Sequence, residues 1–123
     1  MGLDTSHGCW HGAYSSFNRF RKKVCEVAGY GDLDKREGFS DNAPGIPWPT
    51  DDPLVALLHH SDCDGEIAAE DCGPIADRLE GLLPSLERAG DGGGHIGDYA
   101  VAARTFIVGL RDAAAKNEAV DFH

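Results

Sequence analysis

Positive charge, long apolar runs and paired cysteines are the features that this sequence has least of. Its 123 residues hold 11 Lys and Arg against 21 Asp and Glu, which gives a net charge of -10. This excess of negative charge argues against a nucleic-acid backbone or an anionic membrane surface as the main partner. No apolar run approaches the length of a membrane span, and no signal peptide opens the chain. We therefore expect no membrane contact and a cytoplasmic location.

The cysteines also exclude a common class of small protein, the disulfide scaffold. Cys9, Cys25, Cys63 and Cys72 include no C-x-x-C pair. A chain of this length with 41% hydrophobic residues can build a core without covalent staples. We expect reduced thiols, with a bridge between Cys63 and Cys72 as the alternative. The whole chain, residues 1–123, is expected to form one domain.

Apolar residues recur at helical spacing along much of the chain, which predicts a mainly α fold of about four helices with long loops. The expected helices run from Ser15 or Ser16 to about Ala28, from Leu54 to His59, from about Ala69 towards Pro84, and from Tyr99 to Lys116. Pro84 is expected to kink or end the third helix, because proline removes a helical hydrogen bond. Asp98 is a suitable cap for the fourth.

The central stretch fits the frame of a twelve-residue calcium loop when Gly65 takes the sharp-turn position. The ligand positions of that frame then fall on His60, Asp62, Asp64, Glu66 and Asp71. This pattern predicts one EF-hand-like helix–loop–helix and a divalent cation. Two departures broaden the choice of metal to Ca, Zn or Mn. His60 stands where calcium loops have Asp, and Asp71 is shorter than the usual Glu. The alternative is an acidic turn that binds nothing.

The N-terminal stretch offers a second set of metal-capable groups. His7, Cys9 and His11 alternate, so an extended strand would place all three on one face. Three ligands on one strand cannot easily close a tetrahedron, and a fourth would have to come from elsewhere. The alternative is a polar loop with Trp10 packed inward.

The closing residues, Ala119 to His123, predict a short extended tail that can pair with the Leu3–Ser6 run as a small β element joining the chain ends. Phe122 could anchor this tail by burial. If the ends meet near the central loop, a ligand-binding set forms from Asp4, His7, His11, His60, Glu66 and His123.

Three stretches of sequence carry a resemblance to known proteins. They are the opening MGLDTSH with WHG and YSSF, the central HSDCDGE, and the closing Asp121-Phe122-His123. Together they resemble a family of small proteins encoded by phages, prophages and bacteria. The resemblance implies a genomic setting and no mechanism, and it suggests that the two ends and the central loop belong together. By analogy with phage accessory proteins, it also suggests a counter-defence role.

Three classes of function remain open on these residues. A binding module for a divalent cation or a small polar ligand is the first. A metal-dependent hydrolase is the second, although no G-x-S-x-G nucleophile motif is present and the enzyme class is not favoured. The third is a counter-defence protein that sequesters a nucleotide-type immune signal or inhibits a host protein through its acidic surface.

Overall fold

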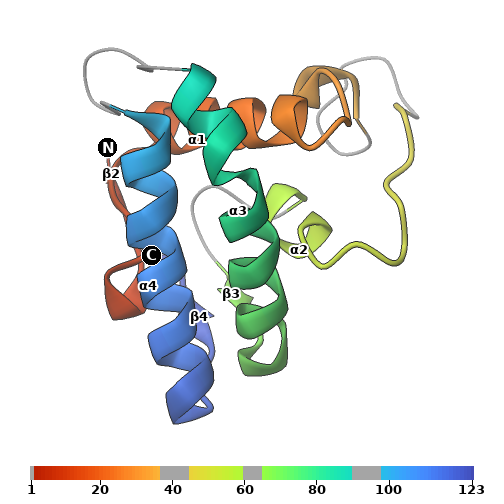
Figure 1. Ribbon diagram of the computed structural model, residues 1–123. Helices are drawn as coiled ribbons and strands as arrows, with labels where there is room; N and C mark the ends of the chain where they lie inside the picture. Colours follow the sequence, from red (N-terminus) through yellow and green to blue (C-terminus); the bar gives the residue numbers. More distant parts are fainter. Residues whose placement is uncertain (1, 37–44, 60–64, 90–97) are drawn as a thin grey trace.

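The computed structural model describes residues 2–36, 45–59, 65–89 and 98–123, and the architecture below refers to these ranges. The predicted ligands His60, Asp62 and Asp64, together with Cys63, lie outside them. Helices α3 and α4 run side by side, and α1 lies across one end of that pair (Figure 1). The short strands and both chain ends gather on one side of the helices.

The described part of the chain is mainly helical, with four α-helices and two small antiparallel sheets, which confirms the expected fold class. The helices are α1 (Tyr14–Val27), α2 (Val55–Leu58), α3 (Ala69–Ala89) and α4 (Tyr99–Lys116), with short 3-10 turns η1 (Ser6–Gly8) and η2 (Leu33–Lys35). The strands are β1 (Gly2–Asp4), β2 (His11–Ala13), β3 (Glu66–Ile67) and β4 (Val120–Asp121).

Helix α4 begins and ends where its sequence predicts. The Asp98 side chain accepts a hydrogen bond from the Ala100 N–H, and Asn117 closes the helix in the left-handed conformation. Phe106, Leu110 and other apolar residues of its stripe are buried against α3. Local signals and packing agree along this helix, so its boundaries were predictable.

Two expected helix boundaries, an end of α3 at Pro84 and a start of α1 after Ser15 or Ser16, are wrong. Helix α3 continues as a helix of 21 residues through Pro84. Leu82 and Leu86 are buried on either side of that proline, and this packing outweighs the loss of one backbone hydrogen bond. Helix α1 begins at Tyr14, before either expected serine cap, and Ser16 is buried.

An aromatic cluster forms the centre of the core. Trp10 packs edge-on against Phe17 with ring centroids 5.3 Å apart, and Phe17 stacks on Phe106 at 6.2 Å. Phe122, from the last residues of the chain, meets the Phe17 ring edge-on at 5.7 Å. The tail is therefore part of the core, as the burial of Phe122 at 2% exposure also shows.

The strands bring together segments far apart in the sequence. Strand β1 pairs with β2, so that Asp4 lies opposite His11. Strand β4 pairs with β3, which places Val120 opposite Ile67. An isolated antiparallel bridge joins Thr5 to Phe122, so the predicted pairing of the two chain ends is confirmed. We call these strands, together with Gly65, Phe122 and His123, the terminal junction.

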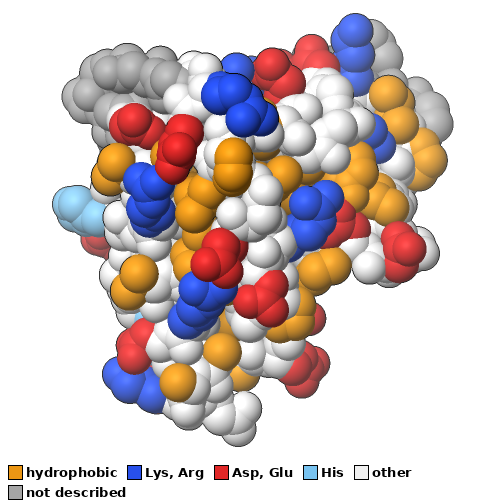
Figure 2. Space-filling model, in the orientation of Figure 1, with side chains coloured by type: hydrophobic (Ala, Val, Ile, Leu, Met, Phe, Trp, Pro, Cys, Tyr) orange, Lys and Arg blue, Asp and Glu red, His pale blue; other side chains and the backbone are white. Residues whose placement is uncertain are grey.

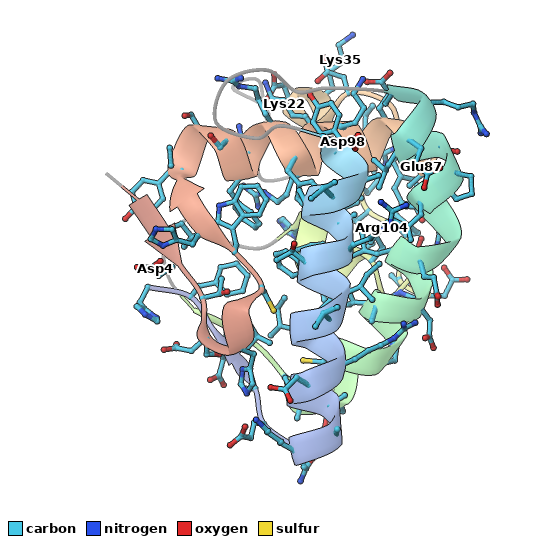
Figure 3. All side chains as sticks on the ribbon, turned by 60° about the vertical axis from the view of Figure 1, so that its left-hand side comes forward. Asp4, Lys22, Lys35, Glu87, Asp98 and Arg104 are labelled. Atoms are coloured by element: carbon cyan, nitrogen blue, oxygen red, sulfur yellow. The ribbon has the colours of Figure 1, made fainter. Side chains whose placement is uncertain are left out.

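The outer surface of α3 and α4 carries charges of both signs close together (Figure 2). Arg111 reaches Asp77 and Glu80 on α3, and Arg104 and Glu87 point toward one another across the two helices (Figure 3). None of the helices in the described ranges combines the length and apolar character needed to cross a membrane.

Candidate functional site

Hydrogen bonds from three backbone N–H groups hold the C-terminal tail in the terminal junction. The Phe122 N–H donates to the Gly65 carbonyl and the His123 N–H to the Asp4 carbonyl, each over 2.8 Å. The Asp121 N–H donates to Ser6 Oγ, also over 2.8 Å. The exit from the predicted calcium loop and both ends of the chain thus lie together.

Each of three histidines of the junction and its neighbouring turn contacts a carboxylate. The pairs are His11 Nδ1 with Asp4 Oδ1, His7 Nε2 with Glu118 Oε1 at 2.9 Å, and His123 Nδ1 with Asp121 Oδ2 at 3.4 Å. These contacts bring Asp4, His11 and His123 of the predicted ligand-binding set into one neighbourhood. A carboxylate beside one ring nitrogen orients an imidazole and leaves the other nitrogen for a ligand.

His7 is held differently from the other two. Its φ of 62° lies in the left-handed region, which is unfavourable for a residue with a Cβ. Its Nδ1 lies 2.8 Å from Ser6 Oγ, and its side chain is only 11% exposed. Both ring nitrogens of His7 therefore contact groups of the protein itself. His7 connects η1 to the segment after α4 and does not join the predicted ligand-binding set.

The N-terminal strand that would place His7, Cys9 and His11 on one face does not form. The 3-10 turn at residues 6–8 breaks it, so that Cys9 is buried while His11 is exposed. Burial raises the pKa of the Cys9 thiol to about 12, and the nearby Cys72 adds to the rise. A thiol this hard to ionise is a poor zinc ligand, which removes the predicted three-ligand arrangement.

Two acidic side chains face one another across β3 and β4. Glu66 is the register partner of Asp121, and both are exposed. Like charges directly opposite each other on a strand pair are destabilising unless a cation lies near them. The predicted ligand Glu66 is thus held in the junction beside the Asp121–His123 pair.

Gly65 to Asp71 make up the second half of the predicted calcium-loop frame. Gly65 has a φ of 91°, which suits a glycine at a sharp turn. Strand β3 occupies the seventh and eighth positions, and α3 begins at the tenth, Ala69. Asp71, the expected last ligand, lies in the first turn of α3 and is half-buried.

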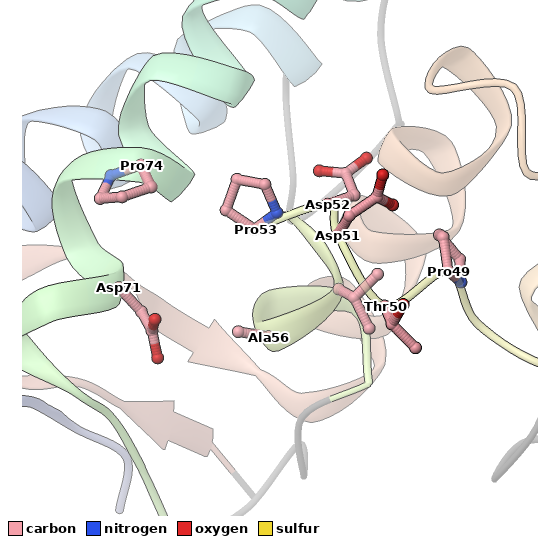
Figure 4. Close-up of a pocket in the computed structure, with 9 residues that line it drawn as sticks. Pro49, Thr50, Asp51, Asp52, Pro53, Ala56, Asp71 and Pro74 are labelled. Carbon is pink, nitrogen blue, oxygen red and sulfur yellow. The ribbon is translucent and has the colours of Figure 1, made fainter.

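Asp71 also lines a surface hollow of about 610 Å³, opposite Asp51 and Asp52 (Figure 4). The Asp52 carboxylate accepts hydrogen bonds from the Tyr30 hydroxyl, the Leu54 N–H and, over 3.2 Å, from Arg78. Burial alone raises the pKa of Asp52, but these donors together lower it below its usual value. Burial and the bond to Asp52 raise the pKa of Tyr30. This network ties the start of α2 to α3.

Within the described ranges, no three His, Cys, Asp or Glu side chains converge in an arrangement that could hold a metal ion. The predicted metal ligands His60, Asp62 and Asp64 fall outside those ranges. The metal prediction for the central loop therefore stays a prediction. Cys9, Cys25 and Cys72 are free thiols, and Cys63, the other half of the alternative bridge, lies outside the described ranges.

Sequence reasoning missed a buried positively charged side chain on α1. Arg21 is 1% exposed, and its guanidinium lies 4.9 Å from the Phe17 ring centroid and donates over 3.4 Å to the Leu58 carbonyl. The sequence does indicate this burial, because Arg21 falls on the same helical stripe as the apolar residues Phe17 and Val24. Glu118 was also missed, and no motif marks it; Asp121 lies in the closing stretch that the sequence singled out, but its contact with His123 was not predicted.

Comparison with known proteins finds no match: no protein-family model, curated protein or solved structure matches the chain.

Proposed function

We propose that this protein is a small binding module that holds a divalent cation, and through it a small polar ligand, at the turn from His60 to Asp71. The observation that carries the proposal is the pairing of β3 with β4. It fixes the strand that follows Gly65 at the place where a calcium loop has its own short strand.

The pairing of β3 with β4 bears on one difficulty of the proposal, namely that a calcium loop rarely occurs alone. Such loops usually occur in pairs, in which the short strand of one loop hydrogen-bonds to that of the other. Only one such loop occurs in this sequence. Here β4 takes the place of the second strand, with Val120 opposite Ile67. Ile67 and Val120 are both buried, so the exit of the loop is anchored to the core before any ligand arrives.

The proposed ligands are His60, Asp62 and Asp64, with Glu66 and Asp71 completing the set. The imidazole favours Mn²⁺ or Zn²⁺ over Ca²⁺, whereas the carboxylates accept any of the three. We extend the proposal by analogy: the sequence resemblance suggests that such a binding module belongs among phage and bacterial accessory proteins.

Thermal unfolding of the EDTA-treated protein, followed with added Ca²⁺, Mn²⁺ or Zn²⁺, tests the proposal. A cation at a hundredfold excess over its dissociation constant should stabilise the native state by about 2.7 kcal/mol. We expect the Asp62→Asn/Asp64→Asn double variant to lose this shift. The matched control is Asp77→Asn/Glu80→Gln, which removes the same charge from the outer face of α3.

The proposal fails if no cation raises the melting temperature. It also fails if the Asp62/Asp64 variant responds to the cations as the control does. A variant more stable than wild type in EDTA and unresponsive to cation supports the proposal, because the carboxylates then repel one another when no ion is bound.

A further inference from the structure

The outer face of α4 has apolar residues along its middle. Val108 is 69% exposed and Val101 is 56% exposed, and they are two of the three large apolar side chains exposed in the described part of the chain. Seven residues make almost two full turns of a helix, so Val101 and Ala115 lie within about 20° of Val108 around the helix axis. Ala115 is exposed as well. We call these three residues the α4 stripe, and no described element lies over α4 in Figure 1 or Figure 3.

The charged residues beside the α4 stripe complement themselves in a second copy. Arg104 comes four residues before Val108 and Asp112 four residues after it, so they lie about 40° to opposite sides of it. When two copies of a helix pack antiparallel about a twofold axis at Val108, residues equally far before and after Val108 meet. Arg104 of each copy then faces Asp112 of the other, and Val101 faces Ala115.

The partners that these two charges have within their own chain hold them weakly. Arg104 pairs with Glu87 and Asp112 with Lys116, and all four side chains are at least 44% exposed. Ion pairs this exposed contribute little to stability and rearrange easily. A guanidinium has five N–H donors, so Arg104 can keep Glu87 and bind Asp112 of a second copy as well.

The surface next to Val108 is hollow. A depression of about 300 Å³ lies between η1 and α4, and Gly8, Thr105, Val108 and Gly109 are among the residues that line it. Each copy therefore offers a protruding valine and, beside it, room to receive one. Both contacts form at once only if a twofold axis relates the two copies.

Helix α4 also escapes the charge that would keep two copies apart. The chain as a whole has a net charge of -10, which opposes self-association. Along α4, however, three basic residues, Arg104, Arg111 and Lys116, stand against one acidic residue, Asp112. The acids that reach α4 from α3 are paired with its two arginines. Two copies can thus approach through this face without meeting an excess of negative charge.

We propose that two copies of this chain associate through α4 as an antiparallel helix pair, with a twofold axis near Val108. The contact from residue 101 to residue 115 is about 21 Å long. One helix pair buries less area than a standard interface, so the dimer is weak and forms at about 0.1–1 mM, not at low micromolar concentration. This inference goes beyond the proposed function, because it uses no residue of the His60–Asp71 turn.

Sedimentation equilibrium in EDTA, from about 10 μM to 1 mM protein, tests the dimer over the range where a weak interface associates. Val108→Asp brings two carboxylates together at the axis and should weaken association at least tenfold. The matched control is Ile46→Asp, which makes the same kind of change at the third exposed apolar residue, outside α4. This control should associate as wild type does.

A mixing experiment tests the antiparallel register. Arg104→Asp places two aspartates opposite each other at both ends of the helix pair, and Asp112→Arg places two arginines there. Each variant alone should therefore be monomeric. An equal mixture should associate as wild type does, because opposite charges again meet at both ends.

Association that Val108→Asp removes and that mixing restores supports the proposal. A wild-type protein that stays monomeric at about 1 mM overturns it, since even a weak interface should assemble at that concentration. It is also overturned if Val108→Asp associates as the Ile46→Asp control does, or if the mixture stays monomeric. All substituted positions are exposed or half-buried, so circular dichroism melts should confirm that the variants stay folded. EDTA removes divalent cations, so these results do not depend on the proposed cation site.

Discussion

The α3–α4 pair and the terminal junction cover the same core by different means. Between the helices, apolar side chains such as Leu79, Leu86 and Phe106 are fully buried, and the ion pairs lie outside on the surface. In the junction, backbone hydrogen bonds hold short strands together, and the apolar side chains of Leu3, Ile67, Val120 and Phe122 are buried. The polar side chains of the junction are exposed: Asp4, His11, Glu66, Asp121 and His123.

The two regions should therefore differ in how strongly a substitution changes the stability of the protein. Changes to the helical pair should alter the free energy of unfolding, because they remove buried volume. Substitutions on the exposed polar face of the junction should leave the free energy of unfolding nearly unchanged. Variants in the two regions test this difference.

The largest effect is expected at Phe106, which is fully buried between Phe17 and Phe20. Phe106→Ala should lower the free energy of unfolding by about 3–5 kcal/mol, because it leaves a cavity in the aromatic cluster. Urea denaturation measures the loss. Val108→Ala, two residues away on the same helix and 69% exposed, is the control and should change stability by less than about 0.5 kcal/mol. Equal effects in the two variants would mean that the core is misplaced.

A smaller effect is expected at Gly109, where η1 approaches α4. A Cβ at this position would lie 2.5 Å from Cys9 Sγ and 2.8 Å from the His7 carbonyl oxygen. Gly109→Ala should therefore destabilise the protein by about 1–3 kcal/mol through overpacking. Gly81→Ala on α3 meets nothing within 4 Å and should stabilise the helix by up to about 1 kcal/mol. Opposite signs in denaturation experiments are expected, and a stabilised Gly109→Ala would contradict the contact between η1 and α4.

The smallest effect concerns Asp52, which precedes α2 and forms an ion pair with Arg78 of α3. Its folded-state pKa is lowered, so its carboxylate stabilises the protein above the unfolded pKa near 3.8, and this contribution is lost as the pH falls through the folded pKa. Asp52→Asn should cost about 1 kcal/mol at pH 7, since the amide still accepts hydrogen bonds. The difference from wild type should shrink below about pH 4. A cost that stays constant down to pH 2 would show that the charge contributes nothing.

The two regions also differ in how far the sequence predicts them. Helix α4 was predictable to its ends because Asp98, the apolar stripe and Asn117 are all local signals. The continuation of α3 through Pro84 was not, since burial of Leu82 and Leu86 is a property of the packed structure. In the junction, the chemistry of Asp121-Phe122-His123 predicted an anchored tail, and Phe122 is indeed buried.

The partners in the junction escaped prediction for a physical reason. Backbone hydrogen bonds leave no signature in residue type, so the pairing of β4 with β3 rather than mainly with the Leu3–Ser6 run could not be foreseen. The left-handed conformation of His7 has no sequence signal either, because such positions favour Gly, Asn or Asp. Arg21 could have been found from its helical position alone.

The tail contacts also set an order of events in folding. Asp121 and Ser6 meet across 115 residues of chain, and His7 and Glu118 across 111. Closing a loop of that length is entropically costly until other contacts have shortened the path, whereas the successive helices α3 and α4 need only a short connection. The junction is therefore expected to close after the helices have docked, which makes it the last part of the molecule to form and the first to open.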